Sequence, residues 1–474
     1  MSLPQRPKII ALHPYWAFWE KAYSGDLRAD KSALLQKAVA AVPTVEFIAT
    51  VLLDDVSACG ELLTHVAGAQ AILVIQSMAA PPALTMQILA LRADLPIVVW
   101  ATQQRDTLPN DFGHSDITSE GATVGTPQLL NLLQRQRRDP VVIVGRVGDA
   151  ECGVRVAQAL RAAAAAGRLK RARLGRVGQP IAGYGCVDAE DHELARALGV
   201  TVVRIEPEAL RQRGARVTKA QINAVASEAR AQFCIDPELE GSLGLSRSMQ
   251  LAVALEELDN ELGLDMGAMN CHVPELRFAP DPGIAPCFAL GRETSRGIPW
   301  SCTGDVLTPI AMLVTKLLAG CAIYHEIEAL DCASDEALLA NSGEHDLGWP
   351  PSAEPPRLHP NPWFRTDEVC GVCATYAPAA GPATLLAFTP HAAEPSGFRF
   401  VAAEGELTQR MFRRTGTVNG AFRFAARGAE RVDRTWAKWA ETGVNHHASL
   451  ARGHLAFEVG LIARLSNVGF VQVT

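Results

Sequence analysis

Three of the 12 histidines of this chain lie close together near its C-terminus, in the segment "NHHASLARGH". They are His446, His447 and His454. Histidine ligates metal ions and transfers protons near neutral pH, so this group is a candidate site. Side chains of adjacent residues in an extended segment point to opposite sides, so we expect at most one of the adjacent pair to face a shared site. The other two histidines would contact substrate or support the site, although a structural role fits the sequence equally well.

Two acidic residues could supply oxygen atoms to such a site. Glu275 follows the apolar segment 267–273 and stands at a Pro-Glu turn, and Asp305 follows the apolar segment 298–302 and a Thr-Gly turn. We expect both carboxylates at the carboxyl ends of strands of one sheet, where ligands of open α/β sheets bind. Taken singly, each has an ordinary explanation, because Asp305 would cap the helix that follows it and Glu275 would be a surface carboxylate.

Taken together, two carboxylates and one imidazole form a ligand set of hard oxygens and one nitrogen. This set suits Mn²⁺ or Mg²⁺, with positions left open for substrate and water, better than it suits a closed zinc site. Two carboxylates held near each other can also divide the roles of general acid and general base.

The segments around these residues alternate between strand-like and helix-like patterns. Short apolar runs such as "KIIALHPYW", "AILVIQSM" and "PIVVWATQ" are separated by helical runs, which predicts a parallel sheet covered on both faces. The pattern begins again near residue 173, so we predict two Rossmann-like α/β domains, at residues 1–172 and 173–350. The proline-rich stretch 347–363 predicts a linker or rigid loop. Short alternating runs follow it and predict a small β-rich domain at 351–474.

Composition narrows the class of protein. The net charge of −7 and the lack of a long basic tract argue against nucleic acid as a partner. The most apolar helical stretch carries Lys316 near its middle, so we predict a buried helix rather than a membrane span. The N-terminus shows no secretion signal, and the 11 scattered cysteines are typical of reduced thiols, so we predict a cytoplasmic protein.

Several segments resemble, in the same order along the chain, those of the L-fucose isomerase and L-arabinose isomerase superfamily. In the predicted second domain they are "RLGRVGQPIAGYGCVDAEDHELARALG", "MNCHVPEL", "GIAPCFALGRETSRGIPWSCTGDVLTPIAMLVTKLLAG" and "ANSG". In the predicted third domain they are "GPATLLAF" and "NHHASLARGH". The resemblance implies two α/β domains followed by a small β-barrel-like domain, and a homo-trimer or homo-hexamer whose active site lies between subunits. It implies an aldose-ketose isomerase that uses Mn²⁺, with Mg²⁺ or Co²⁺ as alternatives, and acts through an enediolate of an open-chain sugar.

The resemblance also implies roles for single residues. The metal ligands fall on Glu275, Asp305 and His447, and the two carboxylates would also move the proton between the sugar carbons. His446 stands where some members have asparagine, so we prefer its neighbour as the ligand. The segment "HPYWAFWE" is similar to one that reaches a neighbouring subunit's site, and Trp16 in it would face the sugar. The remaining predicted substrate contacts are Asn341, His446 and His454.

The chain departs from the family pattern at two places. Thr303 in "CTGD" stands where many members have an acid, and Asn341 in "ANSG" stands where many have His-Cys-Gly. These changes remove a negative charge and a titratable group near the sugar, which would suit a substrate with its own anionic group, such as a sulfo- or carboxy-sugar. Neutral deoxy sugars and pentoses stay open.

Two other functions fit the same sequence. Two α/β lobes around a cleft also describe non-catalytic sugar-binding proteins, and fold alone does not decide function. A metal-dependent lyase or hydrolase of a sugar acid could use the same ligands, and release of a product fragment would distinguish it from an isomerase.

Overall fold

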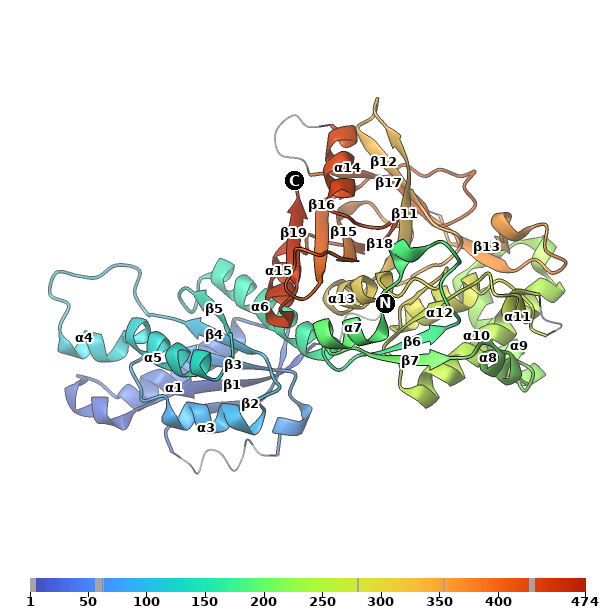
Figure 1. Cartoon of the computed structure of the whole chain (residues 1–474). Helices are drawn as coiled ribbons and strands as arrows, with labels where there is room; N and C mark the ends of the chain where they lie inside the picture. Colours follow the sequence, from blue (N-terminus) through green and yellow to red (C-terminus); the bar gives the residue numbers. More distant parts are fainter. Residues whose placement is uncertain (1–5, 56–61, 63, 279–280, 353, 426–430) are drawn as a thin grey trace. The chain divides into compact units, whose positions relative to one another are not determined.

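The computed structural model describes residues 6–55, 62, 64–278, 281–352, 354–425 and 431–474. The chain folds into two compact units, Gln5–Arg168 and Leu169–Thr474, which are described separately below (Figure 1). None of the described helices is both long and apolar enough to cross a membrane.

The first unit is a five-stranded parallel sheet in the order β2-β1-β3-β4-β5. Its strands are β1 (Lys8–Pro14), β2 (Glu46–Leu53), β3 (Ala71–Gln76), β4 (Ile97–Ala101) and β5 (Val141–Val144). The helical segments between them are η1 (Ala17–Ala22), α1 (Leu27–Ala40), α3 (Ala83–Leu91), α4 (His114–Ser119), α5 (Ala122–Arg135) and α6 (Ala150–Leu169). The parallel sheet predicted from the apolar runs is confirmed, and β3 and β4 are buried along their whole length as such a sheet requires.

The second unit begins with a four-stranded parallel sheet in the order β10-β9-β6-β7. Its strands are β6 (Arg173–Val177), β7 (Thr201–Ile205), β9 (Met266–Met269) and β10 (Trp300–Ser301). The helices that accompany it are α7 (Asp191–Leu198), α8 (Pro207–Gly214), α9 (Lys219–Gln232), α10 (Leu243–Leu262), α11 (Pro274–Arg277), α12 (Cys287–Arg296) and α13 (Thr308–Ala319). The predicted repeat of the parallel pattern after residue 173 is thus confirmed.

The same unit contains a seven-stranded, mostly antiparallel sheet in the order β15-β18-β11-β12-β17-β16-β19. Strand β15 pairs with both β18 and β16, and only the β16–β19 pair is parallel among the described ladders of this sheet. Its strands are β11 (Ile323–Asp331), β12 (Glu336–Ala340), β15 (Gly381–Pro390), β16 (Phe398–Leu407), β17 (Asn419–Phe424), β18 (His447–Arg452) and β19 (Gly469–Val473), with α14 (Val432–Glu441) and α15 (Ala456–Ser466).

This sheet joins strands from both sides of the domain boundary that we predicted at residue 350. β11 and β12 precede that residue, whereas the other five strands follow it. The proline-rich stretch, predicted as a linker or rigid loop, contains β13 (Arg357–Pro360), which pairs with β8 (Cys234–Ile235) and β14 (Val372–Thr375). That stretch is therefore part of the folded unit, and the division into three domains stays a prediction.

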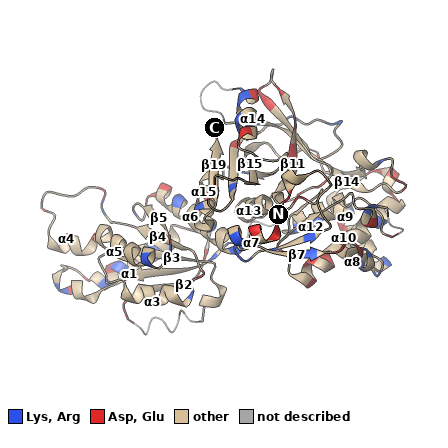
Figure 2. Ribbon diagram, in the orientation of Figure 1, with Lys and Arg blue, Asp and Glu red and all other residues tan. Residues whose placement is uncertain are grey.

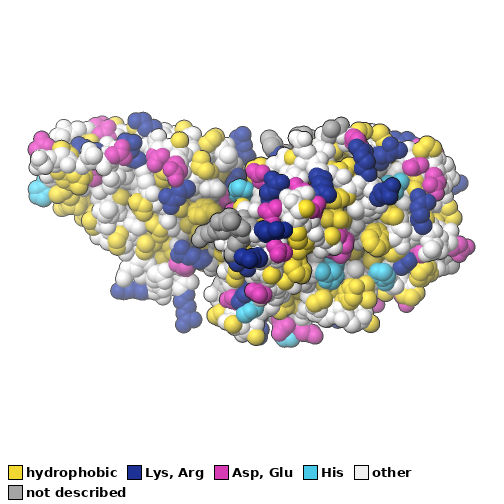
Figure 3. Space-filling view, turned by 90° about the horizontal axis from the view of Figure 1, so that it is seen from above, with side chains coloured by type: hydrophobic (Ala, Val, Ile, Leu, Met, Phe, Trp, Pro, Cys, Tyr) yellow, Lys and Arg dark blue, Asp and Glu magenta, His cyan; other side chains and the backbone are white. Residues whose placement is uncertain are grey.

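Charged side chains are distributed over both units. In Figure 2 lysine, arginine, aspartate and glutamate occur on many helices of each unit. On the face that Figure 3 shows, basic and acidic side chains are interspersed rather than gathered by sign.

A buried acid pair supports the strand that leads to Asp305. The Trp300 indole N–H donates to Asp259 Oδ2 at 3.1 Å, and its ring covers β9 so closely that a Cβ at Gly267 would lie 2.4 Å from it. Burial, and then the charge of nearby Glu293, raises the pKa of Asp259 to about 8. Burial likewise raises the pKa of Glu293 to about 7. The native state therefore holds protons that the unfolded chain releases near pH 4.

The pair contributes fully to the free energy of unfolding below the pKa values that its carboxyl groups have in the unfolded chain. This contribution is lost as the pH rises through their pKa values in the folded protein. We expect the free energy of unfolding to fall by on the order of 2 kcal/mol between roughly pH 6 and pH 8.5, and the Asp259→Asn variant to lose less than half as much. The amide stays neutral and still accepts the indole N–H. Urea denaturation at both pH values measures the change, with Asp331→Asn as a control because the pKa of Asp331 is about 2. Equal losses in all three proteins would show that Asp259 carries no extra proton.

Candidate functional site

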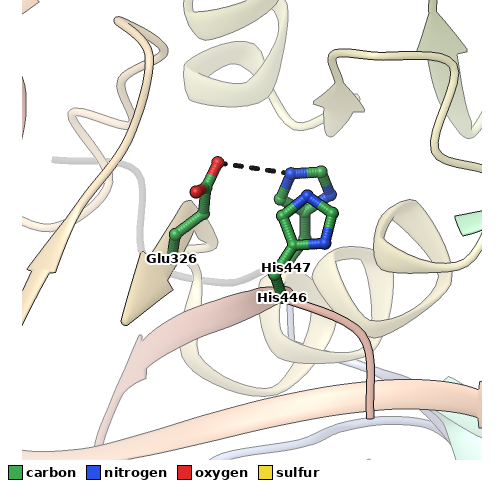
Figure 4. A group of neighbouring side chains, drawn as sticks. All are labelled: Glu326, His446 and His447. Atoms are coloured by element: carbon green, nitrogen blue, oxygen red, sulfur yellow. Dashed lines mark ion pairs between the residues drawn. The ribbon is translucent and has the colours of Figure 1, made fainter. Parts of the chain in front are cut away.

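Two strands of the antiparallel sheet bring three potential ligands together. β11 pairs with β18, and Glu326 lies directly opposite His447 in the register. The two side chains meet, with Nε2 of His447 3.3 Å from Oε1 of Glu326. One ligand atom each from Glu326, His446 and His447 lies within 4.8 Å of the other two (Figure 4). This is the only such group of three among the described residues.

Both adjacent histidines belong to this group, so the expectation that at most one could face it is wrong. Their ring centroids are 3.8 Å apart, with the planes tilted by 43°. The physical reason is that His446 lies in a bend, and β18 begins only at His447. Alternation of sides applies within a strand, not across its first residue.

Asp305 holds His447 from the other side. It is fully buried, and its Oδ2 accepts a hydrogen bond from Nδ1 of His447 at 2.8 Å. The same oxygen accepts from the Thr308 hydroxyl at 2.6 Å, and Oδ1 accepts the backbone N–H groups of Leu307 and Thr308 at 2.9 Å each. Four bonds use the acceptor positions of one carboxylate. Asp305 thus keeps a proton on Nδ1, so Nε2 is the nitrogen of His447 that faces Glu326.

The carboxylates decide the charge of the cluster. Burial alone would lower the pKa of His447, but the hydrogen bonds and charges of Asp305 and Glu326 outweigh it and raise that pKa to about 9. Burial would raise the pKa of Glu326, but the hydrogen bond and charge of His447 lower it below its ordinary value. Burial and the charge of His447 lower the pKa of His446. A cation bound between them would take the place of the proton on His447.

The other predicted site residues of the second unit lie elsewhere. Glu275 is exposed on α11, at the same end of the parallel sheet as Asp305, and is outside the three-residue group. Asn341 is buried, and its amide bonds the backbone of residues 324, 343 and 344. His454 is exposed, with Nε2 3.2 Å from the carbonyl oxygen of Gly405. The predicted ligand set of Glu275, Asp305 and His447 stays a prediction.

Trp16 belongs to the first unit, where it and Phe18 are exposed and lie beside the half-buried Trp19. Its ring stacks on Phe18 at 4.4 Å and meets Trp19 edge-on at 5.7 Å. The strand before it ends in a buried polar cluster, in which Ser77 Oγ lies 2.8 Å from His13 Nε2 and accepts from Lys31 Nζ at 2.9 Å. Burial lowers the pKa of that lysine to about 8. The predicted sugar contact of Trp16 stays a prediction.

Sequence reasoning missed Glu326. The run "IYHEIEALD" predicts a strand, in which Tyr324 and Glu326 lie on one face. A glutamate one residue after the buried pair Tyr324 and His325 is an unusual placement that could have marked it as a candidate.

Comparison with known proteins gives a distant relationship. The chain is 21% identical over 321 residues to the sulfoquinovose isomerase of Priestia aryabhattai and, equally, to that of Priestia megaterium (strain ATCC 12872 / QMB1551). Each match covers 65% of this chain and 66% of the relative, so about a third of each relative has no counterpart in it. No family model matches the chain.

Backbone strain lies next to Asp305. Thr303 has φ 58°, and it is the β-branched member of the four described non-glycine residues with positive φ. Such a residue in the left-handed region costs on the order of 1–3 kcal/mol and persists only where the surroundings impose it. Here its carbonyl accepts the backbone N–H of Ile181 at 3.3 Å.

Replacing Thr303 with glycine should therefore raise the free energy of unfolding by about 1 kcal/mol, because glycine adopts positive φ without steric cost. The same change at Thr201, an exposed residue of β7, should lower it by about 1 kcal/mol. Chemical denaturation measures both. A Thr303→Gly protein as destabilised as the Thr201→Gly control would show that the backbone at Thr303 is unstrained.

Proposed function

We propose that this chain is a metal-dependent aldose-ketose isomerase that acts on an open-chain sugar. The observation that carries the proposal is the convergence of Glu326, His446 and His447, with Asp305 fixing the ring of His447 from behind. The distant similarity to sulfoquinovose isomerases supports the sugar and the reaction type. A protein that only binds sugar has no need of this constellation.

The residues present fit a divalent cation. One carboxylate oxygen and two imidazole nitrogens are the donors of Mn²⁺, Co²⁺ and related ions, whereas Mg²⁺ prefers oxygen alone. A ligating histidine usually donates its second N–H to a carboxylate, which is what Asp305 provides. We therefore propose Glu326, His446 and His447 as the ligands, with Asp305 as the residue that orients His447. Three protein ligands leave positions open for substrate.

The carboxylates then have separate tasks. A divalent cation at this site would supply a Lewis acid that polarises the sugar carbonyl. Glu275 is the proposed general base, since it follows β9 and Asp305 follows β10, the neighbouring strand. It takes the proton from the carbon beside the carbonyl and returns it to the carbonyl carbon. The hydroxyl proton of the first carbon passes to the former carbonyl oxygen, so aldose and ketose interconvert without an external oxidant. Asp305 has its acceptor positions filled and takes no part in that transfer.

The substrate that we propose is an anionic sugar, with sulfoquinovose as the first candidate because it is the sugar named for the relatives. Neutral deoxy sugars and pentoses are the alternatives. We propose a homo-trimer or homo-hexamer as the working form. The test is proton NMR in D₂O, after removal of Mn²⁺-loaded protein by filtration, on sulfoquinovose, L-fucose and L- and D-arabinose. Deuterium at C2 together with a growing ketose supports the proposal. Release of a fragment would indicate a lyase, and binding without exchange would indicate a sugar-binding protein.

The two glutamates make a matched pair of variants. We expect Glu326→Gln to lose both cation binding and turnover, because the amide is a weak ligand. Glu275→Gln should bind the cation like the native protein but turn over roughly 10²- to 10⁴-fold more slowly, the usual contribution of a positioned base. Calorimetric titration with Mn²⁺ and the NMR assay give the two readouts. Full turnover of Glu275→Gln would remove this residue from the mechanism, and loss of cation affinity would make it a ligand.

Asp305→Asn tests the orienting role. An amide N–H facing Nδ1 of His447 would move the ring proton to Nε2 and remove the lone pair that faces the cation. We expect cation affinity to fall roughly 10- to 100-fold. Thr308→Val removes the other side-chain donor to the same oxygen without touching His447, so its affinity should stay native. Equal affinity in the two variants would contradict the orienting role.

A further inference from the structure

The segment 178–188, which follows β6, is a loop held at both ends by one buried guanidinium. Arg176 donates from Nη2 to Gln179 Oε1 at 3.0 Å and to Asp188 Oδ1 at 2.9 Å. Its Nη1 donates to Asp191 Oδ1 at 3.1 Å. The Arg176 side chain is only 4% exposed, whereas those of Asp188 and Asp191 are 36% and 27% exposed, so the anchor is buried on the guanidinium side.

The same loop lies against the residues that carry Asp305. The backbone N–H of Ile181 donates to the carbonyl of Thr303 at 3.3 Å, and the N–H of Val306 donates to the carbonyl of Val187 at 3.1 Å. Gly304 has φ 75°, and a Cβ there would lie 2.7 Å from the Cα of Pro180. These contacts hold the loop against the turn that carries Asp305.

That position places Tyr184 against His446. The two rings meet edge-to-face, with centroids 5.6 Å apart and planes at 88°. Tyr184 is 41% exposed, so its ring is not needed to fill the core. In contrast to His447, which two carboxylates hold, the His446 ring makes no hydrogen bond to the residues that the structure describes. The orientation of the His446 imidazole therefore depends on its contacts with the rings of Tyr184 and His447.

We propose that Tyr184 is a positioning residue of the cation site, whose ring fixes the orientation of the His446 imidazole. The proposal rests on the function proposed above and adds a residue to it. An edge-to-face contact restricts rotation of the imidazole about its side-chain bonds, so the nitrogen that faces Glu326 is already in place when a cation arrives. The loop makes the contact rigid, because Arg176 and the backbone bonds to residues 303 and 306 determine where Tyr184 stands.

Cobalt binding tests the proposal without reference to turnover. We expect Tyr184→Ala to bind Co²⁺ roughly ten-fold more weakly than the native chain, with a changed visible absorption spectrum, because a misplaced ligand alters the metal's geometry. Tyr184→Phe keeps the ring and should bind within about two-fold of native, with the native spectrum. Phe457→Ala is the control for removal of an equally exposed aromatic ring, at 42% exposure, and should leave binding native.

Two checks separate the possible failures. Peptide-resolved labelling of the exposed thiol of Cys186, in the same loop, should be equal in the native chain and in Tyr184→Ala, which shows that the loop is in place. Native affinity and spectrum in Tyr184→Ala would overturn the positioning role alone, provided that Glu326→Gln fails to bind. If the native chain binds no Co²⁺, or if Glu326→Gln binds it as well as the native chain, the proposed function fails and the role of Tyr184 with it.

Discussion

The hydrogen bond between Asp305 and His447 joins two different sheets of the second unit. Asp305 comes from the turn after β10 of the parallel sheet, and His447 is the first residue of β18 of the antiparallel sheet. Both side chains are almost wholly buried, at 0% and 1% exposure. Removing one member of such a buried pair leaves the other without compensation, which typically costs 3–5 kcal/mol. The contact is therefore a condition of the fold as well as of the site.

The rest of the site depends on the register of β18 against its neighbours. Glu326 faces His447 only because these residues are opposite each other in the β11–β18 pair. A shift by one residue would turn the side chain of Glu326 to the other face of the sheet. A second buried contact holds the same register, since the hydroxyls of Thr315 on α13 and Ser449 on β18 lie 2.7 Å apart. Two contacts thus hold β18 against this helix. Asp305, just before α13, holds the first residue of β18, and Thr315 of α13 holds the middle of that strand.

Local pattern in the sequence was enough for the elements and for part of the site. The continuous apolar runs predicted the two parallel sheets. The turn before an apolar helix singled out Asp305, whose side chain accepts backbone N–H groups just ahead of that helix, although the N-cap position itself is Leu307. The error over His446 arose because a strand was assumed to start one residue too early. Glu326 was missed because its partner lies 121 residues later in the chain, and pairing over that distance is set by packing of whole sheets, not by any local period. The same long-range pairing places β11 and β12 in a sheet with strands beyond residue 350.

The charges of the site bear on the proposed substrate. Glu326 and Asp305 together carry two negative charges, which a divalent cation with two neutral imidazoles would balance, and Glu275, the proposed general base, adds one more. An acid at position 303, as in many members of the family that the chain resembles, would add a further negative charge to the site, and Thr303 adds none. Water screens charges only weakly near a buried site. One unit of charge there therefore changes the attraction for an anionic ligand appreciably. Asn341 contributes nothing to this balance, because its amide is buried and bonded to the backbone. Of the two departures from the family pattern, Thr303 is thus the one that favours an anionic sugar.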